Sequence, residues 1–229
     1  PTYFQFAGPS GGVLTMILGQ GQTGGGPQRE RYNVGSQQTV VNLVAAGSPL
    51  DAYSVRFLGS NVFNVLNVYA ASMGVAVLPA ETAALQTATV LNGASLTCGA
   101  GCTFSGTLSL FNSSAVLFDA PNAIVAQQGS SLTVESNGLS YPSVSAISGS
   151  TITWLSDGNI TNLALQTGAI FDKSQDARPI TVAVSSQDGD TTTVRDNWSA
   201  ITWTTAIVFR NAIGSGPVQV GPGRSFKIT

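Results

Sequence analysis

The sequence predicts an all-β protein whose second half is a short parallel β-solenoid. Three observations lead to this prediction. Turn-forming pairs of small residues recur about every 20 residues from residue 86 onward. Apolar residues precede and follow these turns, as expected for strands that share one interior. Only 9% of the residues are charged, against about 25% in an average globular domain, so neutral polar groups must cover most of the surface.

The repeat is clearest in its turns, whose first residues are separated by 20, 16, 20, 19 and 21 residues. A rung of about 20 residues holds two or three short strands but cannot bury its inward side chains alone. Stacking the rungs lines those side chains into one column. The turns are Gly93-Ala94, Ser113-Ser114, Gly129-Ser130, Gly149-Ser150, Gly168-Ala169 and Gly189-Asp190.

About six rungs are therefore expected over residues 86–213, with the apolar residues around each turn facing one interior. An antiparallel sandwich is the competing architecture, which requires a turn every 8–12 residues. The step of 16 is the least regular part of the pattern. The residues expected to point inward after the turns are Leu96, Val116, Leu132, Ile152 and Ile170, and those before them are Val90, Leu108, Ile124, Val144, Leu163 and Val182.

Three further segments flank the predicted solenoid. Residues 1–36 hold nine of the 26 glycines and read as a Gly-rich N-terminal arm with strands near Phe4 and over 13–18. Residues 37–85 contain β-branched and aromatic runs, which predict a β-strand region leading into the solenoid. The pattern breaks after Ile213, and residues 214–229 suit a C-terminal cap.

Composition argues against several functions. The net charge is −2, and no Lys or Arg occurs between Arg56 and Lys173, so a nucleic-acid partner is not expected. No apolar run is long enough to span a membrane. Cys98 and Cys102 cannot assemble a zinc site in a chain without histidine. Free thiols are favoured over a disulfide between them, although both remain open. We expect neither a metal nor another cofactor.

The densest charged segment is 172–178, where Asp172, Lys173, Asp176 and Arg178 alternate in sign. A turn held by Asp side chains and an Asp–Arg ion pair is the favoured interpretation, and a catalytic carboxylate pair is the alternative. The absence of histidine removes the usual general base. We therefore predict no catalytic, cofactor-binding or metal-binding residues.

Two other features have weak functional readings. Asp188-Gly189-Asp190 reads as an ordinary turn rather than part of a calcium site. The tryptophans at 154, 198 and 203 are expected in packing contacts rather than as sugar-stacking platforms. Ile152-Thr153-Trp154 and Ile201-Thr202-Trp203 suggest similar strands in different rungs.

Two segments resemble β-helical structural proteins of tailed bacteriophages. The first runs from Leu58-Gly59-Ser60 to Glu81-Thr82, and the second from Asp157-Gly158-Asn159 to Asp176-Ala177-Arg178. The resemblance covers about residues 55–229 and rests mostly on the solenoid pattern. It implies a virion-associated protein, a homotrimer, and no catalytic residues to carry over.

The expected function is that of a non-enzymatic virion structural protein. Capsid decoration or cement is favoured, with residues 1–36 as the attachment element and the major capsid protein or other virion proteins as partners. The alternatives are a tail, neck or fibre component, or a tailspike-like module that degrades or binds polysaccharide. A chain beginning at Pro1 fits removal of an initiator Met, synthesis in the host cytoplasm and assembly into the virion.

Overall fold

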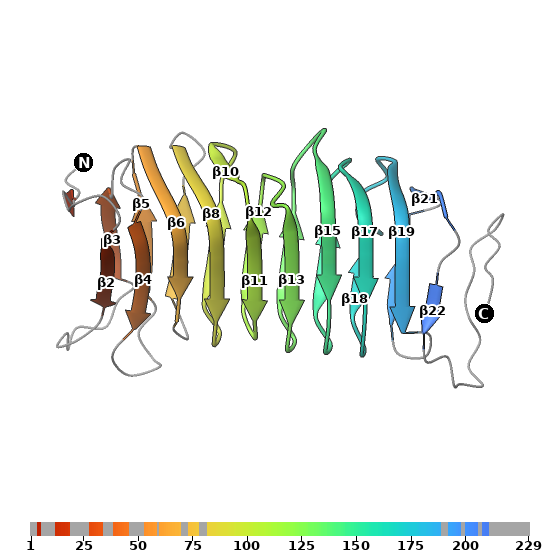
Figure 1. Cartoon of the computed structure of the whole chain (residues 1–229), viewed down its shortest axis with the longest axis horizontal. Helices are drawn as coiled ribbons and strands as arrows, with labels where there is room; N and C mark the ends of the chain where they lie inside the picture. Colours follow the sequence, from red (N-terminus) through yellow and green to blue (C-terminus); the bar gives the residue numbers. More distant parts are fainter. Residues whose placement is uncertain are drawn as a thin grey trace.

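The computed structural model describes residues 4–5, 12–18, 28–33, 39–45, 53–58, 60–69, 73–77, 82–188, 192–197, 200–205 and 208–210. In these residues the chain is all-β, with 22 strands and no helix (Figure 1). Every strand pairing is parallel, and the strands form two long sheets. The predicted all-β fold with a parallel β-solenoid of about six rungs is confirmed, and the antiparallel sandwich is not formed.

The chain alternates between the two sheets, so that each rung contributes one strand to each. We call them sheet I and sheet II. Sheet I consists of β1 (Phe4–Gln5), β3 (Gln28–Asn33), β5 (Tyr53–Phe57), β7 (Met73–Val77), β9 (Ser95–Cys98), β12 (Ser114–Leu117), β14 (Ser131–Val134), β16 (Thr151–Trp154), β18 (Ile170–Asp172) and β20 (Thr193–Arg195). Sheet II consists of β2 (Val13–Leu18), β4 (Thr39–Ala45), β6 (Ser60–Val68), β8 (Thr82–Leu91), β11 (Thr107–Phe111), β13 (Ala123–Gln127), β15 (Ser140–Ala146), β17 (Asn159–Leu165), β19 (Ile180–Asp188) and β21 (Ile201–Trp203), with β10 (Cys102–Phe104) beside β8 and β22 (Val208–Arg210) beside β19.

The solenoid extends further toward the N-terminus than residue 86. Sheet I has six strands within residues 86–213, from β9 to β20, as expected for that segment. The same ladders continue through β7, β5, β3 and β1, and sheet II continues through β6, β4 and β2. The architecture of the described strands therefore does not change at the predicted segment boundaries, between residues 36 and 37 and between residues 85 and 86. The predicted cap at 214–229 lies outside the described residues.

The turns between sheet II and sheet I explain the repeat. Four of them place two consecutive residues at positive φ, at Asn92-Gly93, Gln128-Gly129, Ser148-Gly149 and Thr167-Gly168. Glycine accepts this conformation without a steric cost, and asparagine tolerates it. A small buried residue follows each turn and stacks on its counterparts in the neighbouring rungs. These small residues are Ala94, Ser113, Ser130, Ser150 and Ala169.

The rungs differ in length from turn to turn, at 20, 16, 20 and 19 residues between Asn92, Asn112, Gln128, Ser148 and Thr167. The short rung contains β12 and β13, which are joined by only residues 118–122. The rung before it includes the extra strand β10, and the rung after it has the longer β15. The difference is absorbed at the corner opposite the turns, so the ladders keep their register.

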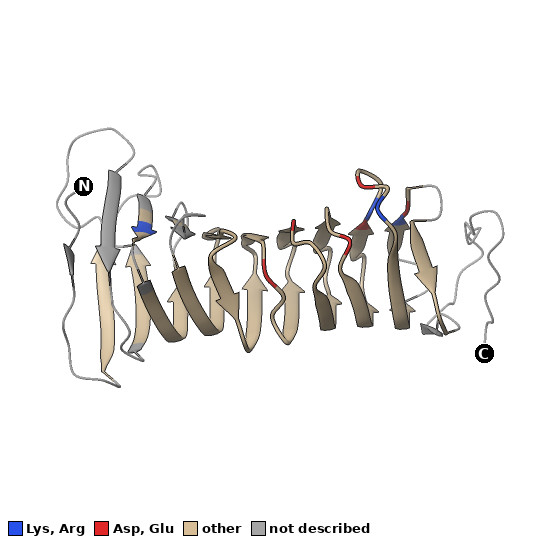
Figure 2. Cartoon of the chain, turned by 90° about the horizontal axis from the view of Figure 1, so that it is seen from above, with Lys and Arg blue, Asp and Glu red and all other residues tan. Residues whose placement is uncertain are grey.

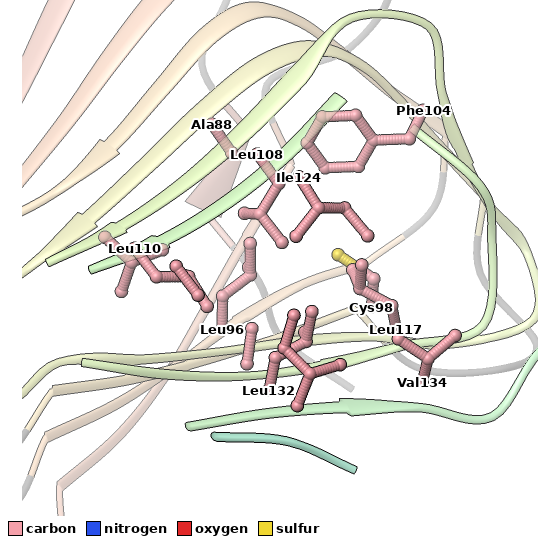
Figure 3. Close-up of a cluster of buried hydrophobic side chains, with 14 of the residues drawn as sticks. Ala88, Leu96, Cys98, Phe104, Leu108, Leu110, Leu117, Ile124, Leu132 and Val134 are labelled. Atoms are coloured by element: carbon pink, nitrogen blue, oxygen red, sulfur yellow. The ribbon is translucent and has the colours of Figure 1, made fainter. Parts of the chain in front are cut away.

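The interior is formed by columns of apolar side chains, each column running from rung to rung (Figure 3). In sheet II, Leu108, Ile124, Val144 and Leu163 occupy paired positions and are fully buried. The facing column in sheet I is Val55, Val75, Leu96, Ala115, Leu132, Ile152 and Phe171.

This register corrects two of the residues predicted to face the interior. Leu96, Leu132 and Ile152 point inward as expected, but Val116 and Ile170 lie on the outer face of sheet I. Their register partners are Thr133 and Thr151, while Ala115 and Phe171 occupy the interior. Adjacent residues of a strand point to opposite faces, so an error of one residue reverses the assignment.

We expect Ile152→Ala to lower the free energy of unfolding by about 2–5 kcal/mol, because it leaves a cavity in the filled column. The same change at Ile170, on the outer face, should cost less than about 1 kcal/mol. Urea denaturation of the two variants measures both values. Equal losses would contradict the inward and outward assignments.

Candidate functional site

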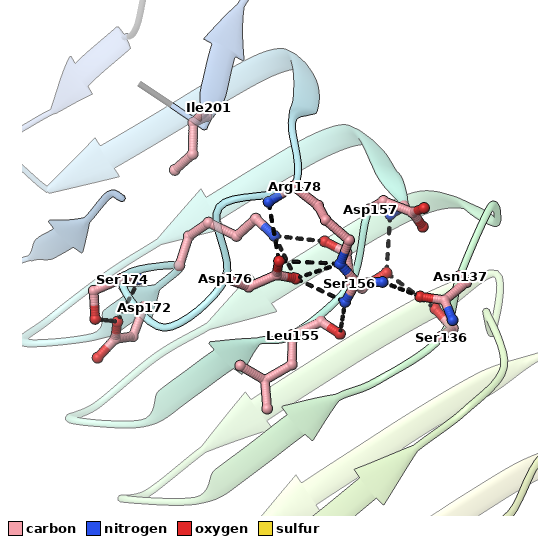
Figure 4. A network of polar contacts seen from close by, with 12 residues as sticks. Ser136, Asn137, Leu155, Ser156, Asp157, Asp172, Ser174, Asp176, Arg178 and Ile201 are labelled. Atoms are coloured by element: carbon pink, nitrogen blue, oxygen red, sulfur yellow. Dashed lines mark hydrogen bonds and ion pairs between the residues drawn. The ribbon is translucent and has the colours of Figure 1, made fainter. Parts of the chain in front are cut away.

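The segment 172–178 forms a charged corner at the end of β18 (Figure 4). Asp176 is buried and stands between two cations. Its carboxylate lies 2.8 Å from Lys173 Nζ and 2.8 Å from a terminal nitrogen of Arg178. The Arg178 Nε–H also donates to Asp176 Oδ1 at 3.0 Å, so the guanidinium grips the carboxylate with two nitrogens.

Lys173 projects into the solenoid instead of toward solvent. It follows Asp172, whose register partner is Thr153, so it stands in line with Trp154 of the previous rung. The side chain is fully buried, and Nζ donates to the Ser156 carbonyl oxygen at 2.7 Å. Burial lowers the pKa of Lys173, while the ion pair with Asp176 opposes that effect. The lysine therefore closes an apolar column with a paired charge.

Arg178 links successive rungs at this corner. Besides Asp176, its guanidinium donates to the Leu155 carbonyl oxygen at 2.8 Å and to Asn137 Oδ1. Burial alone would raise the pKa of Asp176, but hydrogen bonds from Arg178 and Lys173 outweigh that effect and hold this pKa well below its usual value. The carboxylate is thus an ionised structural group with its lone pairs engaged.

Asp172 is engaged separately. Its Oδ1 accepts hydrogen bonds from the Ser174 backbone N–H at 3.0 Å and hydroxyl at 2.6 Å, and Arg195 reaches Oδ2 at 3.1 Å. Burial would raise the pKa of Asp172, but the bonds from Ser174 and then Arg195 lower it. Each of the two aspartates therefore pairs with a cation, as expected for a turn held by Asp side chains and an Asp–Arg ion pair. A catalytic acid needs the opposite environment, one that raises its pKa.

A groove of about 580 Å³ runs across several rungs at the corner opposite the turns. It lies at the short rung, where residues 118–122 replace a strand such as β10. Its walls are formed by Phe104 and Ser105 on one side and by Leu139 and Ser140 on the other. Asp119 is the single carboxylate among the lining residues.

Asp119 compensates for the missing strand. Its Oδ2 accepts the backbone N–H of Phe104 in β10, a donor that the next strand of a ladder would otherwise pair. The Tyr141 hydroxyl donates to the Asp119 carbonyl oxygen at 3.3 Å, and Asn122 donates to the Ser105 carbonyl oxygen. Hydrolysis of a glycosidic bond normally requires two carboxylates, and this groove supplies one that is already hydrogen-bonded.

A second polar cluster lies under the groove, inside the corner. Tyr141 is fully buried, and its hydroxyl is hydrogen-bonded to the Ser136 hydroxyl, which lies 3.2 Å from that of Ser156. Burial raises the pKa of Tyr141 to about 12. No sequence motif marks these hydroxyls, which satisfy one another across two rungs and do not reach the groove surface.

The tryptophans that the structure describes belong to the packing. Trp154 is fully buried, with ring centroids 4.6 Å from Tyr141 and 5.6 Å from Phe171. Trp203 packs half-buried against the core. The two Ile-Thr-Trp segments are not equivalent, since β16 lies in sheet I and β21 in sheet II. Trp198 is outside the described residues.

The cysteines and the candidate metal ligands add no further site. Cys98 and Cys102 are buried free thiols, and the contact with Cys98 together with burial raises the pKa of Cys102. Within the described ranges, no three Cys, Asp or Glu residues gather in a metal-ligand cluster. Gly189 and Asp190 of the predicted turn are outside those ranges. The described residues also contain no helix with the length and apolar character to cross a membrane.

Comparison of the chain with protein-family models, with curated proteins and with solved structures finds no match in any of the three.

We expect Asp176→Asn to lower the free energy of unfolding by about 3–5 kcal/mol, because it leaves the Lys173 charge buried without a counter-ion. Asp157→Asn is the matched control, since Asp157 accepts the Gly138 N–H at 2.6 Å and acts on Lys173 only as a more distant charge, not as its ion-pair partner. Lys173→Met added to Asp176→Asn should restore part of the loss. Chemical denaturation at pH 7 tests all three variants.

The same pair should make stability sensitive to acid. The pKa of Asp176 is lower in the folded chain than its unfolded value of about 3.9, so its contribution is present above that pH and is lost as pH falls toward the folded pKa. Wild type should therefore lose more stability between pH 5 and pH 3 than Asp176→Asn does. Parallel acid-titration slopes for the two proteins would contradict this role.

Proposed function

We propose that this chain is a non-enzymatic structural protein of a bacteriophage virion, with capsid decoration or cement as its favoured place. The observation that carries the structural role is that the carboxylates at the charged corner and in the groove all serve the fold. The resemblance of residues 55–229 to β-helical phage proteins supports the virion. A tail, neck or fibre component is the second candidate, which the elongated stack of rungs suits equally (Figure 1).

Attachment to the particle is proposed through residues 1–36. β2 pairs with β4 along six residues, and its other edge has no partner strand among the described residues. An open parallel edge offers backbone donors and acceptors to a strand of another protein. The N-terminal end of the solenoid thus supplies a means of joining the major capsid protein or another virion protein. Assembly as a homotrimer is also part of the proposal, and the virion is its proposed location.

Deleting residues 2–36 is expected to reduce occupancy on purified particles at least tenfold, because it removes β1, β2 and β3. The later ladders remain, so the truncated chain should keep a β-sheet circular dichroism spectrum. Density-gradient sedimentation of particles with tagged protein measures occupancy. Full-length Thr97→Lys, an exposed change on sheet I, is the control. A wild-type chain absent from particles would contradict the virion role, and a truncated chain at full occupancy would contradict attachment through this segment.

The purified protein should release no oligosaccharide from host surface polysaccharide. The reason is that Asp172 and Asp176 are held as ion pairs, and the groove offers Asp119 alone. Chromatography of the digest against a known glycanase measures release. Cleavage that disappears in Asp119→Asn or in the Asp172→Asn/Asp176→Asn double variant would overturn the non-enzymatic proposal.

A further inference from the structure

The outer face of sheet II has no charged residue over most of its length. The eight strands from β2 to β17, in sheet order, contain no Asp, Glu, Lys or Arg. In β19, Asp188 at the last position is the first such residue on this path. Figure 2 shows the described charges gathered in the upper half of the view, above a row of uncharged strands. The sheet I strands from β7 to β16 are uncharged too, so the feature that distinguishes sheet II is the apolar character of its outward residues.

One edge of this face is apolar on five successive strands. Ladder pairing places one outward residue of each strand beside the next, and the five form what we call the outer apolar column. Two of them are well exposed, Ile17 at 58% and Tyr69 at 39%, and the other three are half-buried. The column consists of Ile17, Val44, Tyr69, Leu91 and Phe111.

The polar groups beside the column are already partly paired with one another. Asn67 Nδ2 donates to Asn42 Oδ1 at 2.9 Å, and Asn42 Nδ2 donates to Thr15 Oγ1 at 3.3 Å. Covering them with another surface therefore costs less than covering unpaired amides. On the far side of this ladder, Val13, Val40 and Val65 form a second apolar row.

Sheet I has a different outer face, although it belongs to the same rungs. From β9 to β16 its outward positions carry hydroxyl side chains with one exception, Val116. These residues are Ser95, Thr97, Ser114, Val116, Ser131, Thr133, Thr151 and Thr153. Hydroxyls suit a hydrated face, whereas valine, leucine and phenylalanine do not. The two faces therefore differ in chemistry for a reason other than forming the rungs.

We propose that the outer face of sheet II, from β2 to β17, is the surface through which copies of this chain associate side by side, with the outer apolar column at the centre of the contact. This inference rests on the self-association proposed above. A second copy is the fitting occupant because copies gathered around one axis through this uncharged face, as in the proposed homotrimer, bring no like charges together. At the spacing of strands and residues in a sheet, the face from β2 to β17 measures about 34 Å by about 17 Å. Its flat area is on the order of 600 Å², and protruding side chains add to it. A standard interface buries about 800 Å² per partner.

The test compares two double variants of the full-length chain. Tyr69→Lys with Phe111→Lys places charges in the column directly after β6 and on β11, two strands apart in sheet II. Thr97→Lys with Thr133→Lys adds the same charge on β9 and β14, two strands apart in sheet I. Light scattering and sedimentation velocity measure the mass at matched concentrations. We expect oligomers for wild type and for the sheet I variant, and association at least 100-fold weaker for the sheet II variant.

Thermal unfolding monitored by circular dichroism checks that each variant is folded. Ile17→Lys, at a position 58% exposed, repeats the test without disturbing burial. A sheet II variant with wild-type mass, or equal dissociation of both variants, would overturn the assigned surface. So would a monomeric wild type whose particle binding is lost only in the sheet II variant, since the face would then bind another protein. If wild type is a monomer that still binds particles, the sheet II proposal fails and the virion role does not. If wild type is an oligomer that is absent from particles, the virion role fails and the sheet II proposal does not.

Discussion

The fold depends on parallel register between rungs. Each backbone ladder places a residue directly beside the equivalent residue of the next rung, so one position defines a whole column. Leu108, Ile124, Val144 and Leu163 show the consequence in sheet II, where four rungs bury four similar side chains at one place. A rung has no core of its own, and its stability comes from the two neighbours that cover its edges. Keeping the strands in register therefore contributes more to the stability of this fold than keeping every rung the same length.

The short rung illustrates this priority. Residues 118–122 cross the corner without forming a strand, and the ladders on both sides stay in register. A side chain replaces the missing backbone hydrogen bond, because the Asp119 carboxylate accepts the Phe104 N–H. Such substitution of a side chain for a backbone partner is what turns the corner into a groove. The groove is a by-product of rung length, which explains why its one carboxylate is oriented toward the backbone.

The sequence revealed the repeat because the turns require residues that tolerate positive φ, and Gly93, Gly129, Gly149 and Gly168 are easily recognised. It failed at Val116 because the turn at Asn112 has a single residue at positive φ, so counting from the small pair moved the assignment by one position. Ile170 is the first apolar residue after its turn, but Phe171 has the three-residue spacing from the turn glycine that Leu96, Leu132 and Ile152 share. The sequence did not predict the N-terminal rungs as part of the solenoid because β3, with Gln28 and Glu30, is polar in composition.

The charged corner was found from sequence, but its role depends on a fact that only register supplies. Lys173 falls at an inward position, in line with Trp154, so its charge must be neutralised inside the solenoid. Asp176 does this, and Arg178 also binds the same carboxylate and ties the corner to the Leu155 carbonyl oxygen. In the same rung the interior of sheet II also becomes polar, with Ser185 and Gln187 hydrogen-bonded at buried positions. Polar inward residues at these positions cannot stack on apolar partners without a cost, so they are hydrogen-bonded to each other within the rung. The association that we propose for the outer face of sheet II does not involve these interior groups.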